Sequence, residues 1–305
     1  MDRETWLQWR RRGIGSSDAA AICGLSPWRS PLAVYLDKIG ELPDEEPSEA
    51  MEWGVRLEPI VAEAWAERTG KKIRRRNAIL QHPQYPWMLA NVDRFVVGEN
   101  AVLEVKTTSA FGADAWADGA VPDHYVIQVQ HQMAVTGCEK AYLAVLIGGN
   151  HLECREIERD EELIARLIEI EAEFWRRVEE RRPPEPDGSE ADAAAIRRLY
   201  PESVEGKTVI LPPDARELLE ARRAAKADLE DAQARLRAID SRLQALVGDA
   251  EAAYLPGSSK PVVTWKTVIS QRVDTEALKA AGLYEAYTKP SVSRRWLVKE
   301  DAINE

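Results

Sequence analysis

The 305-residue chain lacks the features of a secreted or membrane-embedded protein. No run of apolar residues approaches the roughly 20 that a membrane-spanning helix needs, and the first twelve residues carry charges throughout, unlike a signal peptide. The three cysteines, Cys23, Cys138 and Cys154, have no metal-ligand spacing and leave an odd thiol, which predicts reduced thiols in the core. We therefore expect a cytoplasmic protein without a membrane partner.

The chain also has fewer basic than acidic residues. Lysine and arginine number 41 against 52 aspartates and glutamates, a net charge of −11, which disfavours broad electrostatic attraction to nucleic acid. Contact with a nucleic acid would have to come from local basic clusters. These occur at residues 10–12, 71–76 and 294–295, whereas acidic residues concentrate at 41–52 and 153–162.

What the sequence does contain is a chemically unusual hairpin at residues 91–107. Two short runs rich in β-branched residues flank a glycine-containing turn at residues 98–100, a pattern that predicts paired strands. Because strand side chains alternate between faces, Glu104 and Lys106 share one side of their strand. The hairpin pairing then brings Asp93 across to join them.

Two carboxylates and a lysine beside buried strands are costly unless they are paired. A divalent cation is the usual way to neutralise Asp93 and Glu104 together, and oxygen ligands with open positions suit Mg²⁺ or Mn²⁺ rather than zinc. The alternative interpretation is structural, because Glu104 and Lys106 at a strand end can also form a solvent-facing ion pair.

A second candidate site lies near the start of the chain. A turn containing Gly13 and Gly15 leads into a helix that Ser16, Ser17 or Asp18 can cap, with the arginines at 10–12 just upstream. Free N–H groups and positive charge at such a helix start favour an anion, and phosphate is the natural guest. An ordinary N-cap without a ligand is the alternative.

Two polar residues on predicted helices could also face the hairpin. Glu58 lies at the edge of an apolar stripe in the helix at 51–69, and Pro59 behind it predicts a kink or restart. The stripe consists of Trp53, Leu57, Ile60, Val61 and Ala64. In the helix at 122–136, Gln128 and Gln130 flank the buried stripe on opposite sides, so only one of them can face the carboxylates. A surface position is the commoner situation for a residue such as Glu58.

The order of predicted elements indicates an α/β (α+β) domain. A helix, three strands (71–80, 87–97 and 101–107), a helix, a buried strand (141–147) and an edge strand (151–158) precede a long helix at 160–182. We predict a domain over 1–182, a linker with a short helix over 183–212, and a distinct module over 213–305. The helix from 214 to 247 carries a heptad seam and must lie against another helix, and 262–272 with 293–299 suggest a small sheet.

The ordered motifs resemble a known family. The pattern D-x(10)-E-V-K resembles the PD-(D/E)XK nuclease core, with Val92 in place of the leading proline. WLQWRRRGIGSSD, WGVRLEP, NVDRF, LEVKT and YVIQVQHQMAVTG occur in the order found in the YqaJ-like viral recombinases, which include lambda exonuclease. The resemblance covers about residues 1–180 and implies a central mixed sheet flanked by helices, and three cysteines are too few for an iron–sulfur member.

The resemblance implies a role for each matching residue. Asp93, Glu104 and the Val105 carbonyl would bind Mg²⁺, with Glu58 assisting at a second metal. Lys106 would orient or deprotonate the attacking water. Gln128 matches the family glutamine better than Gln130 does. Arg10 and Ser17 match positions that hold a terminal 5′ phosphate, with Arg12 and Ser16 beside them.

The resemblance also implies an activity and partners. The family digests one strand of duplex DNA from a 5′ end and leaves a 3′ overhang for a single-strand annealing protein. A trimeric ring is the implied assembly, in the cytoplasm of a phage-infected or prophage-bearing bacterial host. A restriction-type endonuclease and a non-catalytic DNA-binding scaffold remain alternatives.

Overall fold

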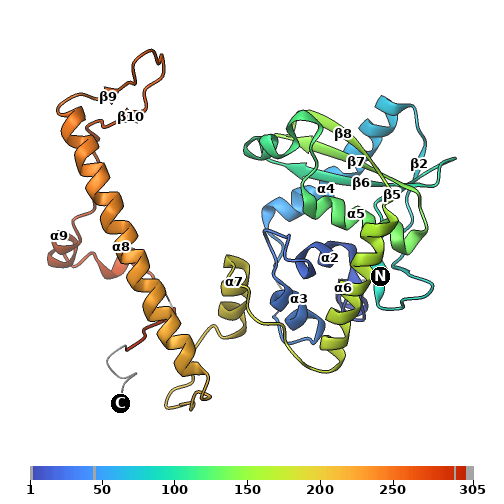
Figure 1. Ribbon diagram of the computed structural model, residues 1–305, viewed down its shortest axis with the longest axis horizontal. Coiled ribbons are helices and arrows are strands. Elements are labelled where there is room, and N and C mark those ends of the chain that lie inside the picture. Colours follow the sequence, from blue (N-terminus) through green and yellow to red (C-terminus); the bar gives the residue numbers. More distant parts are fainter. Residues whose placement is uncertain (1–2, 44–45, 292, 300–305) are drawn as a thin grey trace. The chain divides into compact units, whose positions relative to one another are not determined.

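The computed structural model describes residues 3–43, 46–291 and 293–299. The chain forms two compact units, Met1–Tyr200 and Pro201–Glu305 (Figure 1). No helix among these described residues is long and apolar enough to cross a membrane. All three cysteines are free thiols; Cys138 is buried as expected, whereas Cys23 and Cys154 are only half-buried.

The first unit contains seven helices, a 3₁₀ segment and eight strands within the described residues. In chain order they are α1 Arg3–Arg10, β1 Ile14–Gly15, α2 Ser16–Ile22, α3 Pro31–Lys38, α4 Glu49–Thr69, β2 Ile73–Arg74, β3 Leu80–Gln81, β4 Met88–Ala90, β5 Arg94–Val96, β6 Ala101–Thr108, the 3₁₀ segment Ala110–Gly119, α5 Asp123–Thr136, β7 Lys140–Ile147, β8 His151–Glu158, α6 Glu161–Glu179 and α7 Glu190–Leu199.

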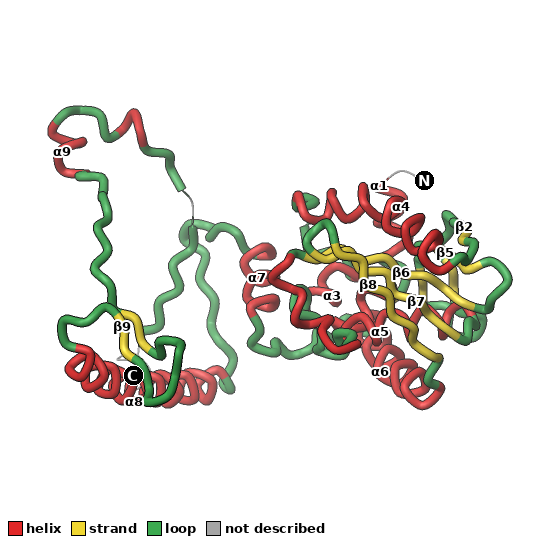
Figure 2. Tube along the Cα trace, turned by 90° about the horizontal axis from the view of Figure 1, so that it is seen from above, coloured by secondary structure: helices red, strands yellow, loops and turns green. Residues whose placement is uncertain are grey.

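A mixed five-stranded sheet forms the centre of this unit, with strand order β2-β5-β6-β7-β8. Strands β6 and β7 run parallel, and the other neighbours are antiparallel. Figure 2 shows α4 on one side of the sheet and α5 and α6 on the other. The predicted α/β fold, a mixed sheet flanked by helices, is therefore confirmed.

The side chains of β6 point alternately to the two faces of the sheet, which explains how both faces are covered. Leu103 and Val105 pack against α4, where Trp65 is the largest buried side chain. Val102, on the opposite face, packs against Met133 of α5. Burial on both faces accounts for the nearly continuous apolar character of β6 and β7, as expected for a parallel pair.

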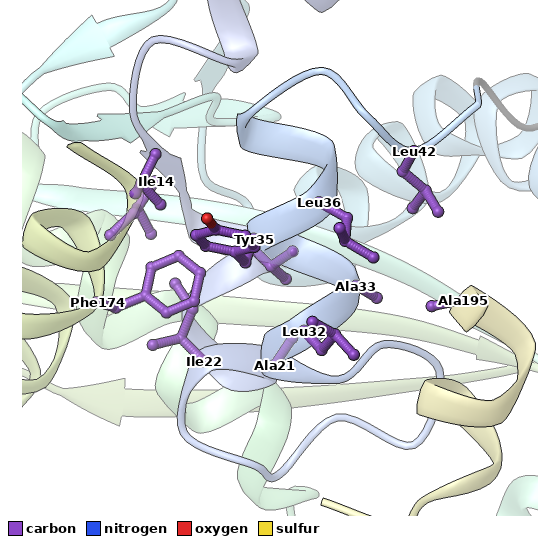
Figure 3. Close-up of a cluster of buried hydrophobic side chains, with 12 residues drawn as sticks. Ile14, Ala21, Ile22, Leu32, Ala33, Tyr35, Leu36, Leu42, Phe174 and Ala195 are labelled. Atoms are coloured by element: carbon purple, nitrogen blue, oxygen red, sulfur yellow. The ribbon is translucent and has the colours of Figure 1, made fainter. Parts of the chain in front are cut away.

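A separate apolar cluster anchors the N-terminal helices, and Figure 3 shows its side chains. It joins Ile14 before α2, Tyr35 of α3, Phe174 of α6 and Ala195 of α7. The junction at which β1 passes directly into α2, between Gly15 and Ser16, is thereby attached to the packed helices. The short helix predicted in the linker belongs to this packing, since Ala195 is buried here and the first compact unit extends to Tyr200.

Two predicted strands are wrong as single elements, because each is divided between two sheets. Residues 71–80 give β2 and β3, and residues 87–97 give β4 and β5; β3 and β4 join β1 in a separate three-stranded sheet. Asp93 lies in the break before β5. Its Oδ2 accepts a hydrogen bond from the Val105 backbone N–H at 2.8 Å. In a continuous strand, a backbone carbonyl would have accepted this hydrogen bond instead of the Asp93 side chain.

Helix α4 also differs from the prediction. It is assigned continuously from Glu49 to Thr69 with Pro59 inside, so the helix does not restart there. Its buried residues are Val61, Ala62 and Trp65, whereas Trp53 and Ile60 of the predicted stripe are exposed. The fully buried part of the contact with the sheet therefore lies in the second half of the helix, while Leu57 in the first half packs partly buried against the same cluster.

The second unit contains the long helix α8, Ala215–Val247, as predicted. Its heptad residues Leu229, Leu236, Ile239 and Leu243 are exposed, so the described part of this chain does not cover the seam. The remaining elements are β9 Ala252–Ala253, β10 Val263–Thr264, α9 Thr275–Ala280 and a 3₁₀ turn Glu285–Tyr287. The predicted small sheet is wrong in composition, because β10 pairs with the nearby β9 and not with residues 293–299.

Candidate active site

The predicted carboxylates and lysine meet at the β5–β6 pair. Strand β5 pairs antiparallel with β6, with Arg94 opposite Leu103, and Gly98 makes the turn between them with φ +86°. Asp93, Glu104, Val105 and Lys106 then line one pocket, which Glu58 of α4 also lines. The convergence expected from the hairpin is present.

Glu104 is the most completely bonded residue of the site. Its Oε1 accepts hydrogen bonds from Lys106 Nζ at 2.7 Å and Gln128 Nε2 at 2.6 Å, and its Oε2 accepts one from Gln132 Nε2 at 2.7 Å. Gln130 instead bonds the backbone of residues 158 and 160. Gln128 is therefore the glutamine that faces the site, as predicted.

Gln132 is a site residue that the sequence argument missed. It also reaches the Asn91 carbonyl at 3.3 Å, so it links Glu104 to the break that positions Asp93. The available signal was its spacing, because Gln132 follows Gln128 by four residues and residues i and i+4 share a helix face.

The electrostatics of the acid pair favour a cation. Burial and the nearby charges of Glu104 and Glu58 together raise the pKa of Asp93 to about 8, against the opposing effect of the Val105 hydrogen bond. A carboxyl that resists ionisation in this way lacks a positive partner of its own. Two acids and a backbone carbonyl in one pocket form the all-oxygen donor set that suits Mg²⁺ or Mn²⁺.

The third acid is engaged elsewhere. Glu58 Oε1 lies 2.6 Å from Arg94 Nη1 and 4.0 Å from Arg75 Nη2. With Glu58 paired in this way, Asp93 and Glu104 are not joined by a third ligand. Among the described residues, no three acidic, histidine or cysteine side chains are arranged around a single metal position. Glu58 faces the site as predicted, but as the partner of a buried arginine.

Lys106 is held as an ammonium. Burial alone would lower the pKa of Lys106, but the charge and hydrogen bond of Glu104 outweigh it and keep that pKa above its ordinary value. The ring of Tyr125 lies 5.0 Å from Nζ. An oriented donor is the chemical form that this environment supports.

The predicted phosphate-binding residues lie on the other side of the same acids. A cavity of about 170 Å³ is lined by Arg10, Ser16 and Ser17 together with Asp93 and Glu104. Arg10 Nη2 donates to Ser17 Oγ at 3.2 Å. This cavity joins the two candidate sites into one.

Arg12 and Ser16 are placed differently from Arg10 and Ser17. Arg12 is not among the residues that line this cavity, and its guanidinium lies 4.4 Å from the centre of the Trp9 ring. Ser16 lines the cavity but is buried.

A buried carboxylate behind the cavity was not expected. Asp18 is completely buried and accepts hydrogen bonds from Arg10, Arg29 and Lys38. Burial alone would raise the pKa of Asp18, but these three cations outweigh it and hold that pKa far below its ordinary value. Asp18 also accepts the N–H of Gly15, the N-cap residue of α2, at 3.1 Å, so Asp18 rather than a serine side chain fixes the helix start that carries Ser16 and Ser17.

The fold and the site define a mixed α/β protein with two acids and a lysine on neighbouring segments of its sheet. Residues 5–139 match the YqaJ-like viral recombinase domain. The chain is 42% identical to the uncharacterised protein YqaJ of Bacillus subtilis, over 98% of this chain and 95% of that protein. The chain therefore belongs to the YqaJ-like viral recombinase family, as its motifs indicated.

Solved structures show a weaker similarity. An alkaline exonuclease from Laribacter hongkongensis aligns with a TM-score of 0.49 and 21% identity, over 58% of this chain and 93% of that chain. A phage-related exonuclease from Haemophilus somnus aligns with a TM-score of 0.46 and 13% identity, over 55% of this chain and 94% of that chain.

Proposed function

We propose that this protein is a Mg²⁺-dependent exonuclease that digests one strand of duplex DNA from a 5′ end during recombination and leaves a 3′ overhang. The observation that carries the proposal is the shared cavity. Arg10 and Ser17 on one side and Asp93 and Glu104 on the other line the same space. Groups that suit a terminal phosphate thus lie next to groups that suit hydrolysis.

Asp93, Glu104 and the Val105 carbonyl would hold Mg²⁺ or Mn²⁺, and Glu58 could add an oxygen ligand by exchanging its Arg94 partner. A divalent cation bound there would supply a water nucleophile at neutral pH and relieve negative charge on the scissile phosphate. The raised pKa of Asp93 supports this role, because a cation would replace the proton that the buried carboxyl otherwise retains.

The protein's own groups orient the reaction. Gln128 and Gln132 fix the two oxygens of Glu104, and Lys106 donates to the same carboxylate. From that position Lys106 would hold the attacking water by hydrogen bonding. Lys106 would have to lose its own proton before it could act as the base that accepts a proton from that water.

The phosphate side would determine where the strand is cut. Arg10 and Ser17 would hold the terminal 5′ phosphate by charge-assisted hydrogen bonds. A fixed distance from this pocket to the acids would place the first phosphodiester bond at the hydrolytic groups. Each cut exposes a new 5′ phosphate, which can occupy the same pocket.

Linear and closed circular duplexes of the same sequence test this proposal. With Mg²⁺, we expect the linear 5′-phosphorylated duplex to lose one strand as mononucleotides and the closed circle to stay intact. Cleavage of the circle would favour a restriction-type endonuclease. Binding of both without any Mg²⁺-dependent hydrolysis would favour a DNA-binding scaffold, and either result would overturn the proposal.

Partners follow from the same activity. The substrate is a duplex DNA end, and the 3′ overhang is the form of DNA that a single-strand annealing protein uses. The proposed setting is the cytoplasm of a phage-infected or prophage-bearing bacterium, and the proposed assembly is a trimeric ring. Light scattering of the purified protein measures the assembly directly.

A further inference from the structure

Trp28 is an exposed aromatic side chain that the proposed mechanism does not use. It lies in the loop between α2 and α3, and 65% of it is exposed. His124 contacts it in a T-shaped arrangement at 5.0 Å, and the Tyr125 ring lies 6.3 Å away. An indole held in this way by neighbouring rings and still open to solvent is suited to contact a flat ligand.

The position of Trp28 connects it to the hydrolytic lysine. The Tyr125 ring beside Trp28 is the ring that lies 5.0 Å from Lys106 Nζ. Trp116 stacks on Tyr125, with the two ring centres 5.4 Å apart. Aromatic rings therefore extend without interruption from the surface to the ammonium group that faces Glu104.

Trp28 is also linked to the phosphate side through its neighbour in the chain. The next residue, Arg29, donates to Asp18 at 2.7 Å, and Asp18 also accepts a hydrogen bond from Arg10. His124, which contacts Trp28, precedes the cavity-lining Gln128 by one helical turn. A nucleotide held between Arg10 and Glu104 would have its base within reach of Trp28 and His124.

We propose that Trp28 stacks on a nucleobase of the two nucleotides at the 5′ end that enters the cavity. This inference rests on the proposed function. Every base has a π-face, so stacking on an indole holds the end without selecting a sequence. The positive charge of the chain is local, and a stacking contact would add affinity that the net charge of −11 does not supply.

The test measures binding of 5′-phosphorylated duplexes in EDTA, where hydrolysis does not occur. Three duplexes are compared: one intact, one abasic at nucleotides 1 and 2, and one abasic at an internal position. The variants are Trp28→Ala, the conservative Trp28→Phe, and Trp265→Ala as a control, since Trp265 is a tryptophan of comparable exposure, 49%, in the other compact unit.

We expect Trp28→Ala to weaken binding of the intact and internally abasic duplexes about tenfold, a typical effect of losing one stacked base. The terminally abasic duplex should bind wild type and Trp28→Ala equally, and Trp28→Phe should retain most of the affinity. Trp265→Ala should not distinguish among the three duplexes. An equal loss on all three with Trp28→Ala would overturn the inference, as would no loss on any.

These outcomes are separable from the proposed exonuclease activity. If wild type releases mononucleotides with Mg²⁺ but Trp28→Ala shows no dependence on the terminal bases, only the stacking role is wrong. If wild type hydrolyses no duplex, the exonuclease proposal fails, while the binding comparison in EDTA still reports on Trp28.

Discussion

Lys38 Nζ donates to Asp18 Oδ2 at 2.6 Å, and neither side chain is exposed. The same ammonium also donates to the Arg10 carbonyl at 2.9 Å. Lys38 therefore links the buried carboxylate to the backbone of the residue that reaches Ser17. The proposed phosphate pocket depends on α3 through this pair.

Lys38→Met should lower both stability and phosphate recognition. Removing one partner of a buried ion pair leaves the other charge buried with less compensation. Because Asp18 keeps two arginines, we expect a loss at the lower end of the usual range, about 3 kcal/mol in the free energy of unfolding. The preference for 5′-phosphorylated over 5′-hydroxyl duplex should also shrink. Urea denaturation and the ratio of the two digestion rates measure these effects.

Arg166→Met is the matched control, since Arg166 is an exposed α6 residue paired with Glu169. It should change neither quantity appreciably. A Lys38→Met protein that is destabilised but keeps its full phosphate preference would limit Lys38 to a structural role.

Gln132→Met should reduce hydrolysis by about tenfold or more, the range seen when a residue that orients a metal ligand is lost. The reason is that Glu104 Oε2 would lose its 2.7 Å donor. Gln130→Met on the same helix is the control, because Gln130 bonds the chain near residues 158 and 160 and not the site. Equal turnover numbers for the two folded variants would exclude this role for Gln132.

Divalent cations should stabilise the folded protein through Asp93. Mg²⁺ or Mn²⁺ at 100 times its dissociation constant should add about 2.7 kcal/mol to the free energy of unfolding. Asp93→Asn should remove most of this gain, because the amide lacks the charge. Thermal unfolding with and without the cation measures it, and Asp231→Asn on the exposed face of α8 should keep the full gain. An undiminished cation effect in Asp93→Asn would contradict the proposed ligand.

His131 predicts a pH dependence of stability. Burial alone would lower the pKa of His131, but Glu171, 2.8 Å from Nδ1, outweighs it and raises that pKa above the ordinary value. A raised pKa in the folded state gives stability that is fully present below about pH 6.5 and is lost as the pH rises through the folded value.

The double variant His131→Gln/Glu171→Gln removes both titrating groups. The stability of wild type relative to this variant should therefore decrease between pH 6 and pH 9, measured by denaturant unfolding. His151→Gln serves as a control, since His151 is exposed and its pairing with Glu153 should contribute little. A constant difference between wild type and the double variant across this range would refute the assignment.

The parts of the fold that sequence could predict are those set by local rules. Strand alternation and the turn at Gly98 were sufficient to bring Asp93 to Glu104. Helical periodicity was sufficient to separate Gln128 from Gln130. In each case the relevant residues lie on one hairpin or on one helix, so their spacing alone determines to which side their side chains point.

The parts that sequence could not predict depend on distant contacts. Lys38 reaches Asp18 across 20 residues, and Arg94 pairs with Glu58 across 36; neither spacing has a local signature. The break at Asp93 was missed for a different reason: its partner lies on the same hairpin, but side-chain alternation does not show that a carboxylate will accept the Val105 N–H in place of a strand carbonyl.

The central claim is that Asp93, Glu104 and Lys106 together hydrolyse DNA from a 5′ end. The most direct measurement is release of labelled mononucleotide from a 5′-³²P linear duplex, with Mg²⁺ or EDTA, by wild type and Lys106→Ala. We predict release by wild type with Mg²⁺ only, and none by Lys106→Ala, although this variant still binds the duplex. Full release by Lys106→Ala, or release by wild type in EDTA, would contradict the account.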